Sequence, residues 1–230
     1  MIVCRASQKI TSAFLPLDQS NSEEKADFIV SVVGNDPRLR MLARLVEGSG
    51  YPVQGYSSAA DFIGQRGPNT SGCVVVDLQS PNVFTLQDTL AREEPPPPII
   101  FISEANDFVA SVQAMKAGAF DVLTKPADRK SLLCSISLAL KRYAKARHEH
   151  QKRSTIRRKF ATLTKREIEV LRHVIAGKLN KEIAFALGTV EKTIKVHRSR
   201  AARKLGAHSV VELLRLASMA GVTPYVTDNN

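Results

Sequence analysis

Three residues with complementary chemistry stand at the ends of apolar runs in the first half of the chain: Asp77, Ser103 and Lys125. If these runs are parallel strands, their carboxyl ends meet at one edge of a sheet, where ligands usually bind. A carboxylate can accept a phosphoryl group, a hydroxyl can hydrogen-bond a transferred oxygen, and an ammonium can balance the charge. A single Asp or Lys at a strand end is usually only a surface cap, but three at successive strand ends favour a phosphoryl-accepting pocket.

The region that must position these residues, 27–140, alternates apolar runs with stretches of helical periodicity. This alternation is typical of a parallel sheet covered by helices on both faces. We therefore predict a doubly wound α/β domain built on a five-stranded parallel sheet. The predicted strands are 28–33, 52–56, 73–77, 99–103 and 121–124, and the predicted helices are 37–48, 58–65, 83–92, 106–117 and 127–143.

This region resembles the receiver domains of two-component response regulators, which have a flavodoxin-like fold. It is most similar to the FixJ type, on the strings VVVDLQSP and AMKAGAFDVLTKP. The resemblance implies that Asp77 is the phosphoacceptor, Ser103 the switch hydroxyl and Lys125 the lysine of the phosphate pocket. It also implies that the backbone carbonyl of Gln79 faces a divalent cation, and that a histidine kinase is a partner.

The metal-binding positions depart from the receiver pattern. Receivers carry two adjacent carboxylates after the first strand, and these positions hold Gly34 and Asn35 here, with Asp36 one residue later. Mg²⁺ needs oxygen ligands in near-octahedral geometry, and without it the transferred phosphoryl group loses its main counter-charge. We therefore expect no metal cofactor beyond weak Mg²⁺ binding at Asp36, Asp77 and Gln79, and a receiver that acts independently of phosphorylation.

The residues that relay phosphorylation in receivers also differ. Val122 stands where the resemblance places an aromatic switch residue, and Phe120 lies two residues earlier. Ser80 and Thr85 replace the Met and Gly that receivers often have after the acceptor. The sequence therefore predicts an atypical receiver.

The second half of the chain carries start and stop signals for short helices. Thr164 followed by Glu167 is the pattern of a capping box, and Gly177 stands where a left-handed residue would end that helix. Asn180 is predicted to cap the second helix. We expect an all-α domain of four helices over 161–230, with the helix, turn, helix order of a DNA-binding head.

The third of these helices, predicted over about 190–205, has an apolar side and a basic side. Ile194, Ala201 and Leu205 fall on the inner side at about 100° per residue. A basic outer face fits the major groove of duplex DNA, whereas a solvated charged face is the alternative for an isolated helix. The outer side and its flanks carry Lys192, Lys195, Val196, Ser199, Arg200 and Arg203.

This half of the chain resembles the LuxR-type helix-turn-helix domains, on the strings LTKREIEVL, NKEIAFALG and TIKVHRSRAARKLG. The resemblance implies that Lys195, Val196 and Ser199 meet bases. One departure is that Val190 replaces the usual Ser or Thr cap of the third helix, with Thr189 one residue earlier. The residues implied near phosphates are Lys192, Thr193, Arg198 and Arg200. The last helix is implied to pair two protomers, and its apolar side consists of Leu213, Leu216, Ala217 and Ala220.

Charge is divided unevenly along the chain. Residues 141–230 contain 21 Lys and Arg against seven Asp and Glu, a net charge of +14, whereas residues 1–140 carry a net charge of −3. A half this basic is expected to bind a polyanion with strong salt dependence. Anionic membrane is the weaker candidate, because no segment approaches the length of an apolar spanning helix. Double-stranded DNA is therefore the predicted polyanion.

The remaining segments complete the predicted domain organisation. Residues 1–26 are predicted to be a loose leader. Residues 141–160, with nine Lys and Arg and one Glu, are predicted to be a basic helical linker that loosens near Ser154–Thr155. Such a run is usually a solvated connector, and added phosphate contacts are the alternative. Three scattered cysteines form neither a disulfide framework nor a metal-ligand spacing, which favours a reducing interior.

Together these features predict a sequence-specific, DNA-binding transcriptional regulator of the response-regulator type. We expect it to act as a homodimer in the bacterial cytoplasm, at the nucleoid when bound to DNA, with no membrane partner and no enzymatic activity. Two alternatives stay open for the receiver. It could serve a conventional phospho-aspartate relay, or it could be a protein- or ligand-interaction module.

Overall fold

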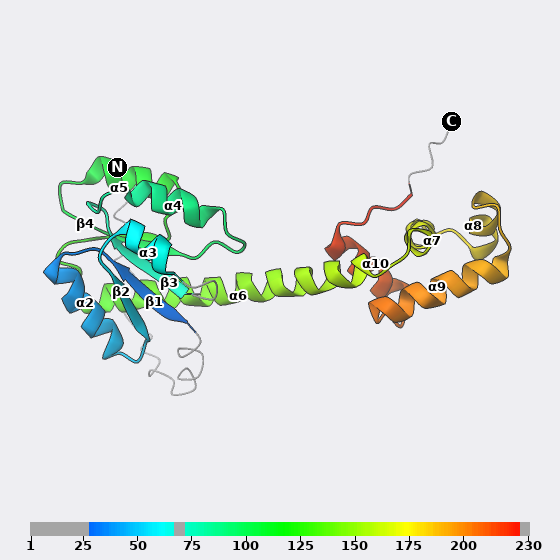
Figure 1. Ribbon diagram of the computed structural model, residues 1–230, viewed down its shortest axis with the longest axis horizontal. Helices are drawn as coiled ribbons and strands as arrows, with labels where there is room; N and C mark the ends of the chain where they lie inside the picture. The colour runs from blue at the N-terminus through cyan, green and yellow to red at the C-terminus, as the bar shows by residue number, and fades with distance from the viewer. Residues whose placement is uncertain (1–27, 67–71, 226–230) are drawn as a thin grey trace, which may run out of the picture. The chain divides into compact units, whose positions relative to one another are not determined.

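The structure, a computed structural model, describes residues 28–66 and 72–225, so the predicted leader over 1–26 lies outside the described residues. The chain divides into two compact units between Ala144 and Lys145. The first unit contains the parallel sheet, and the second contains the helices of the C-terminal half (Figure 1).

The sheet of the first unit has five parallel strands in the order β2-β1-β3-β4-β5. This is the predicted doubly wound topology, and the described strands begin and end within one residue of the predicted ones. The strands are β1 (Ile29–Val33), β2 (Val53–Tyr56), β3 (Gly72–Asp77), β4 (Ile99–Ser103) and β5 (Asp121–Thr124).

Helices cover both faces of this sheet (Figure 1). On one face, α2 and the first part of α6 pack with Val30, Val75 and Ile100. On the other face, α3, α4 and α5 pack with Val76 and Phe101. The bounds of these helices are α2 (Pro37–Glu47), α3 (Ala59–Gln65), α4 (Val83–Ala91), α5 (Phe108–Lys116) and α6 (Arg129–Ala161).

The central strand β3 is buried along its whole length, as its run of β-branched residues predicts. The first residue of this strand is Gly72. A Cβ atom at this position would lie 1.8 Å from the carbonyl oxygen of Ile29 on β1. The close approach of the two backbones therefore requires glycine. Asp77 ends the same strand at the carboxyl edge of the sheet.

Helix α6 continues without a break to Ala161, so the predicted loosening near Ser154–Thr155 is wrong. The segment contains no Gly or Pro, and most of its polar residues favour helix. In addition, Ile156 and Phe160 pack into the core of the second unit. The end of the predicted linker is therefore part of the helical unit.

The second unit contains the four predicted helices, and they enclose two apolar clusters. Leu171 and Ile175 of α7 lie in one cluster, where they are buried with Phe160. The other cluster holds Val170 and Val174 of the same helix together with residues of α8 and α9. The bounds are α7 (Lys165–Ile175), α8 (Asn180–Ala186), α9 (Glu191–Leu205) and α10 (Val210–Ala220).

The helix caps agree with the sequence prediction in part. The capping box is confirmed: the Glu167 N–H donates to Thr164 Oγ1 over 3.2 Å, and the Thr164 N–H donates to Glu167 Oε2 over 2.8 Å. The prediction that Asn180 caps α8 is wrong, because Asn180 is the first residue inside that helix. Val190 is itself the N-cap residue of α9, where it offers no side-chain hydrogen bond.

The predicted dimer side of α10 proves to be core. Leu213, Leu216 and Ala217 are buried in the apolar cluster of the same unit, and Ala220 packs against it. The helical unit can bury this side because α6 contributes Phe160 and Ile156, which lie outside the predicted head. Leu213, Leu216 and Ala217 are therefore covered within one protomer, so the prediction that they form a dimer interface is wrong for these three residues, whereas the role of the partly buried Ala220 in pairing is not tested.

The Glu167 carboxylate is buried and should stabilise the helical unit. Lys204 Nζ donates to Glu167 Oε2 over 2.7 Å, and this bond, followed by the Thr164 N–H, holds the pKa of Glu167 below its usual value. The stabilisation is therefore present above the unfolded pKa, about 4.5, and is lost as pH falls through the lowered folded pKa. We expect Glu167→Gln to lower the free energy of unfolding at pH 7 by about 1–3 kcal/mol, measured by urea unfolding.

A matched control is Glu169→Gln on the same helix. Glu169 pairs with Arg166 over 3.0 Å, but both side chains are more than a third exposed, so the loss should be below about 1 kcal/mol. Equal losses for the two variants would contradict the special role of Glu167. That role would also be contradicted if the free energy of unfolding of the parent protein did not decrease at acidic pH.

Candidate receiver pocket and nucleic-acid interface

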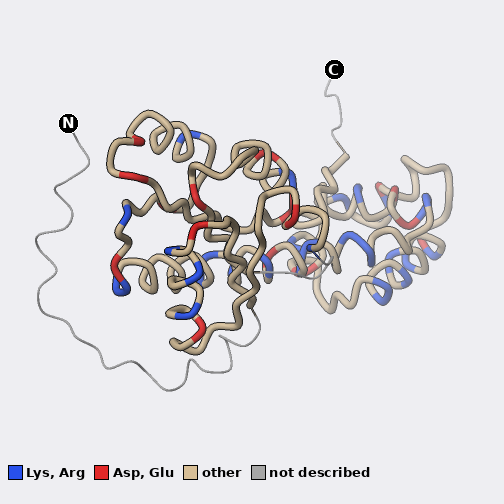
Figure 2. The backbone as a smooth tube through the Cα atoms, turned by 60° about the vertical axis from the view of Figure 1, so that its left-hand side comes forward, with Lys and Arg blue, Asp and Glu red and all other residues tan. Residues whose placement is uncertain are grey.

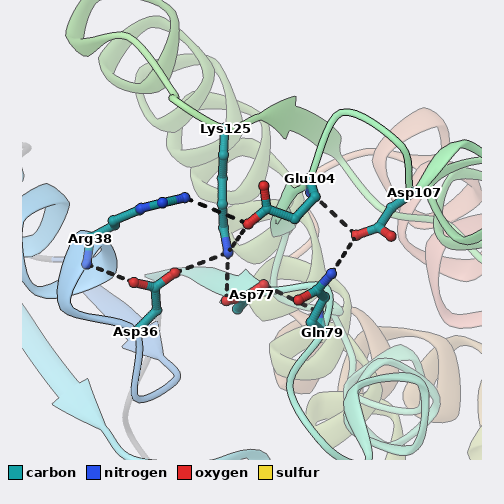
Figure 3. Close-up of polar contacts among 7 residues, drawn as sticks. All are labelled: Asp36, Arg38, Asp77, Gln79, Glu104, Asp107 and Lys125. Carbon is teal, nitrogen blue, oxygen red and sulfur yellow. Dashed lines mark hydrogen bonds and ion pairs between the residues drawn. The ribbon is translucent and has the colours of Figure 1, made fainter.

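Lys125 lies at the centre of a cluster of carboxylates at the carboxyl edge of the sheet (Figure 3). Its ammonium nitrogen is 2.8 Å from Asp77 Oδ2, 3.1 Å from Asp36 Oδ2 and 3.3 Å from Glu104 Oε1. Burial alone would lower the pKa of Lys125, but the hydrogen bonds to Asp77 and Asp36 and the contact with Glu104 raise it above its usual value. The ammonium is therefore charged and paired at neutral pH.

The strand ends bring these groups together. Asp77 ends β3, and Glu104 directly follows β4. Lys125 directly follows β5, and its N–H donates to the carbonyl oxygen of Ser103 over 2.7 Å. The structure thus brings Asp77 and Lys125 into contact, as the sequence predicts, and buries Ser103 at the end of the strand between them.

Asp36 contributes to the pocket as the N-cap residue of α2. Its Oδ1 accepts the backbone N–H of Arg38 over 2.8 Å, while its Oδ2 faces Lys125. The Arg38 N–H, followed by Lys125, lowers the pKa of Asp36. Both carboxylate oxygens of Asp36 therefore already have a cationic or N–H partner.

Both carboxylate oxygens of Asp77, the predicted phosphoacceptor, also accept hydrogen bonds. Asp77 Oδ1 accepts the backbone N–H of Gln79 over 3.1 Å, and Asp77 Oδ2 contacts Lys125. The Gln79 side chain in turn donates to Asp107 Oδ2 over 3.2 Å, and the Glu104 N–H donates to the same oxygen over 3.3 Å. These bonds connect the segments that follow β3 and β4.

The residues present do not fit a receiver-type Mg²⁺ site. Gly34 has a φ of +139°, and a Cβ atom there would lie 2.7 Å from Leu39 Cδ1, which is held in the core. A carboxylate at position 34 would therefore strain the backbone and clash. Asn35 supplies an amide in place of the second carboxylate. Among the described residues no group of three or more His, Cys, Asp or Glu is suited to hold a metal.

Sequence reasoning missed Glu104. It directly follows Ser103, so the argument that strand ends converge would have included it. Besides Lys125, it faces Arg38 Nη1 over 3.7 Å (Figure 3). The pocket therefore contains three carboxylates, of which only Asp77 and Asp36 were predicted.

Phe120 does not take the place of the aromatic residue expected at position 122. Phe120 packs against the core cluster that α2 and α6 cover, whereas Val122 packs on the opposite face of the sheet. Phe120 and Val122 therefore belong to different core clusters, on opposite faces of the sheet.

The outer side of α9 is exposed, as the periodicity predicts. Its inner residues Ile194, Ala201 and Leu205 are buried. Lys195 makes an exposed i,i+4 ion pair with Glu191 over 3.1 Å, which contributes little stability. The exposed candidates are Lys192, Lys195, Val196, Ser199, Arg200 and Arg203, while Thr193 and Arg198 are partly buried.

Arg198 has a structural partner. Its Nη1 donates to Asn180 Oδ1 over 3.2 Å and so connects α9 to the first turn of α8. Figure 2 shows that Lys and Arg recur along the helical unit. The described helices include none that is long and apolar enough to cross a membrane.

Each of the two units matches the model of a known protein family. The family model for the response regulator receiver domain matches residues 30–137, and the model for bacterial regulatory proteins of the luxR family matches residues 161–217. The transcriptional regulatory protein FixJ of Azorhizobium caulinodans is 34% identical over 198 residues, which cover 85% of this chain and 94% of that protein. The transcriptional regulatory protein TdiR of Thauera aromatica is 38% identical over 191 residues, covering 80% and 83%.

Solved structures give the same result. The response regulator StyR has a TM-score of 0.76 at 35% identity, covering 84% of this chain and 99% of that chain. Full-length FixJ from B. japonicum has a TM-score of 0.51 at 31% identity, covering 85% and 98%. The chain therefore belongs to the response regulators of the FixJ type, DNA-binding transcriptional regulators that join a receiver to a LuxR-type helix-turn-helix domain and are not enzymes.

Proposed function

We propose that this regulator controls transcription without phosphorylation of Asp77. The observation that carries the proposal is the pairing of Lys125 with three carboxylates, Asp77, Asp36 and Glu104. An incoming phosphoryl group would bring further negative charge to an ammonium that is already paired. It would also lack a metal ion to offset that charge, because position 34 does not accommodate a carboxylate.

Glu104 supports this reading most directly. Its carboxylate supplies a fixed anion beside Lys125, at the edge where the oxygens of a phosphorylated Asp77 would otherwise be balanced. Arg38 faces the same carboxylate. The receiver would then hold one conformation in which Lys125 is permanently engaged.

A conventional relay is the second candidate, because Asp77, Ser103 and Lys125 all stand at the receiver positions. A receiver implies a histidine kinase as the partner, and that kinase would then phosphorylate Asp77. The two candidates differ in whether phosphate reaches Asp77 and in whether the affinity for DNA responds.

The test uses Asp77→Asn in the full chain. We expect its affinity for DNA to stay within a few-fold of the parent, because Asp36 and Glu104 still pair with Lys125. We also expect the unaltered protein to gain little phosphate from acetyl phosphate and Mg²⁺, as measured by intact mass. Asp88→Asn, at an exposed carboxylate on α4, is the matched control.

A gain-of-function arm sharpens this test. Asn35→Asp combined with Glu104→Ala adds a carboxylate at the metal edge and removes the competing one, so Mg²⁺ affinity and phosphate incorporation should both rise. Position 34 is left as glycine because of its φ. Phosphorylation of the unaltered protein within minutes, with a changed affinity for DNA, would favour the conventional relay instead.

We further propose that α9 enters the major groove, with Lys195, Val196 and Ser199 meeting bases. Exposure of these three side chains supports the assignment. The cytoplasmic nucleoid of a bacterium is the proposed place of action. The proposed phosphate contacts are Lys192, Thr193, Arg198, Arg200 and Arg203.

Protomers are proposed to pair through the outer side of α10, in place of the buried side that the sequence suggested. Val211 is 75% exposed and Leu214 is 42% exposed, and the two are three residues apart on one face of the helix. An exposed apolar pair on the last helix of a small unit favours a self-complementary contact about a two-fold axis. A two-fold DNA site would then be bound by two heads.

A further inference from the structure

The end of helix α6 carries a basic cluster that neither family model includes, because residues 138–160 lie between the two matched regions. Lys152, Arg153 and Arg157 line a cleft of about 590 Å³ between α6 and the end of α10, where Ser218 and Gly221 form the other side. Glu149 is the one acidic residue of this lining. The three cations are exposed.

We propose that this cluster, Lys152, Arg153 and Arg157, binds the phosphate backbone of duplex DNA that flanks the recognised site. The inference goes beyond base reading by α9. It assigns a second, sequence-independent contact to three named residues of a segment for which the sequence left a solvated connector and added phosphate contacts both open.

The cluster is fixed to the DNA-binding head. Ile156, next to Arg157, and Phe160, about one turn further along α6, pack into the apolar core of the helical unit. Lys159 Nζ donates to the carbonyl oxygen of Leu205 at the end of α9 over 3.2 Å, and Lys204 Nζ donates to Thr162 O over 3.1 Å. A head bound through α9 therefore carries these cations at a set position, so little chain entropy is lost when they meet phosphates.

The spacing and charge of the cluster suit a nucleic-acid backbone. Lys152 and Arg157 are five residues apart, which is about 7.5 Å along a helix axis. Duplex DNA carries about one negative charge per 1.7 Å of its axis, so several phosphates fall within that span. Because Glu149 is the only acid lining the cleft, most of the positive charge is available to an anion.

The test compares the full chain with the triple variant Lys152→Gln, Arg153→Gln, Arg157→Gln. The logarithm of the binding constant is measured against the logarithm of salt concentration, on a duplex with long flanks. Each lost phosphate contact lowers the slope by about 0.9, so the triple variant should lose about two to three. The ratio of specific to non-specific affinity should change little, because no base contact is removed.

The matched control removes three exposed cations from the receiver unit by Arg40→Gln, Arg92→Gln and Lys116→Gln. It changes net charge equally and should leave the slope unchanged. A second experiment uses a duplex trimmed to the recognised site alone. On this duplex the triple variant and the parent should show the same salt slope. If the triple variant does not fold by circular dichroism, Arg157→Gln alone should lower the slope by about one.

The inference is overturned by an unchanged slope in a folded variant, by an equal loss of slope in the control, or by a loss of slope that persists on the trimmed duplex. The inference is also overturned if the triple variant loses binding to inorganic tripolyphosphate or to anionic vesicles while its salt slope on DNA stays unchanged. The cluster would then bind another anion. If the unaltered protein itself shows no salt-dependent DNA binding, the assignment of α9 fails first, and the two failures are thereby distinguished.

Discussion

Replacing Lys195 with alanine is expected to weaken binding at the recognised DNA site by about 1–3 kcal/mol, or roughly 5- to 150-fold, and to relax base preference at one position of each half-site. Lys195 lies on the exposed side of α9, and its ion pair with Glu191 is open to solvent. That pair costs little to break, so the ammonium is available to a base edge in the major groove. Binding to non-specific DNA should fall much less.

The measurement is a competition assay in which every base of the site is varied in turn. Lys165→Ala is the matched control, because it removes an exposed ammonium from the first turn of α7 in the same unit. It should lower affinity for all sequences only slightly. If Lys195→Ala reduced affinity uniformly, with base preference unchanged, Lys195 would be a phosphate contact and the recognition face would need to be reassigned.

The sheet could be predicted from the sequence almost to the residue. Its strands are short β-branched runs such as Val74–Val76, flanked by Gly and Pro or polar residues, and burial on both faces makes them continuously apolar. Helix α6 was the exception. The sequence gives no stop signal inside it, and the tertiary contacts of Ile156 and Phe160 extend it beyond the predicted loosening.

The pocket could be predicted in outline. Strand-end convergence places Asp77 beside Lys125, and the observed separation is 2.8 Å. The pairing of Asp36 with Lys125 could not be read from spacing, because it depends on the turn by which Asp36 caps α2. Likewise, the φ of +139° at Gly34 follows from the folded loop, so the sequence showed a missing carboxylate but not that the space for it is missing too.

Periodicity on α10 could not distinguish a core from an interface. An apolar stripe reports only that one side of a helix is covered, and the covering group can belong to the same chain or to a partner. Here part of the covering group is Phe160, which packs in the same core cluster as Leu213 and Leu216 but which the sequence analysis assigned to a linker. The assignment of Leu213 and Leu216 to a dimer seam was therefore an error about where the head begins.

Leu213 and Leu214 are neighbours in sequence, yet their substitutions should have opposite consequences. Leu213 is 3% exposed, so Leu213→Ala should leave a cavity and lower the free energy of unfolding of the helical unit by about 2–5 kcal/mol. Leu214 is 42% exposed, so Leu214→Ala should change that free energy by less than about 0.5 kcal/mol. Urea unfolding followed by circular dichroism measures both.

Substitutions on the exposed and the buried side of α10 then separate folding from pairing on DNA. Val211→Glu with Leu214→Glu should keep the fold and half-site binding but remove cooperative binding to a two-fold site, since two protomers would bring like charges together. Leu213→Ala should weaken half-site and two-fold binding in equal proportion, through loss of folded protein. If the double variant binds the two-fold site as cooperatively as the parent, α10 is not the seam. Pairing would then have to involve another surface, for which the exposed apolar residues of α5, Phe108, Val109 and Met115, are the candidates.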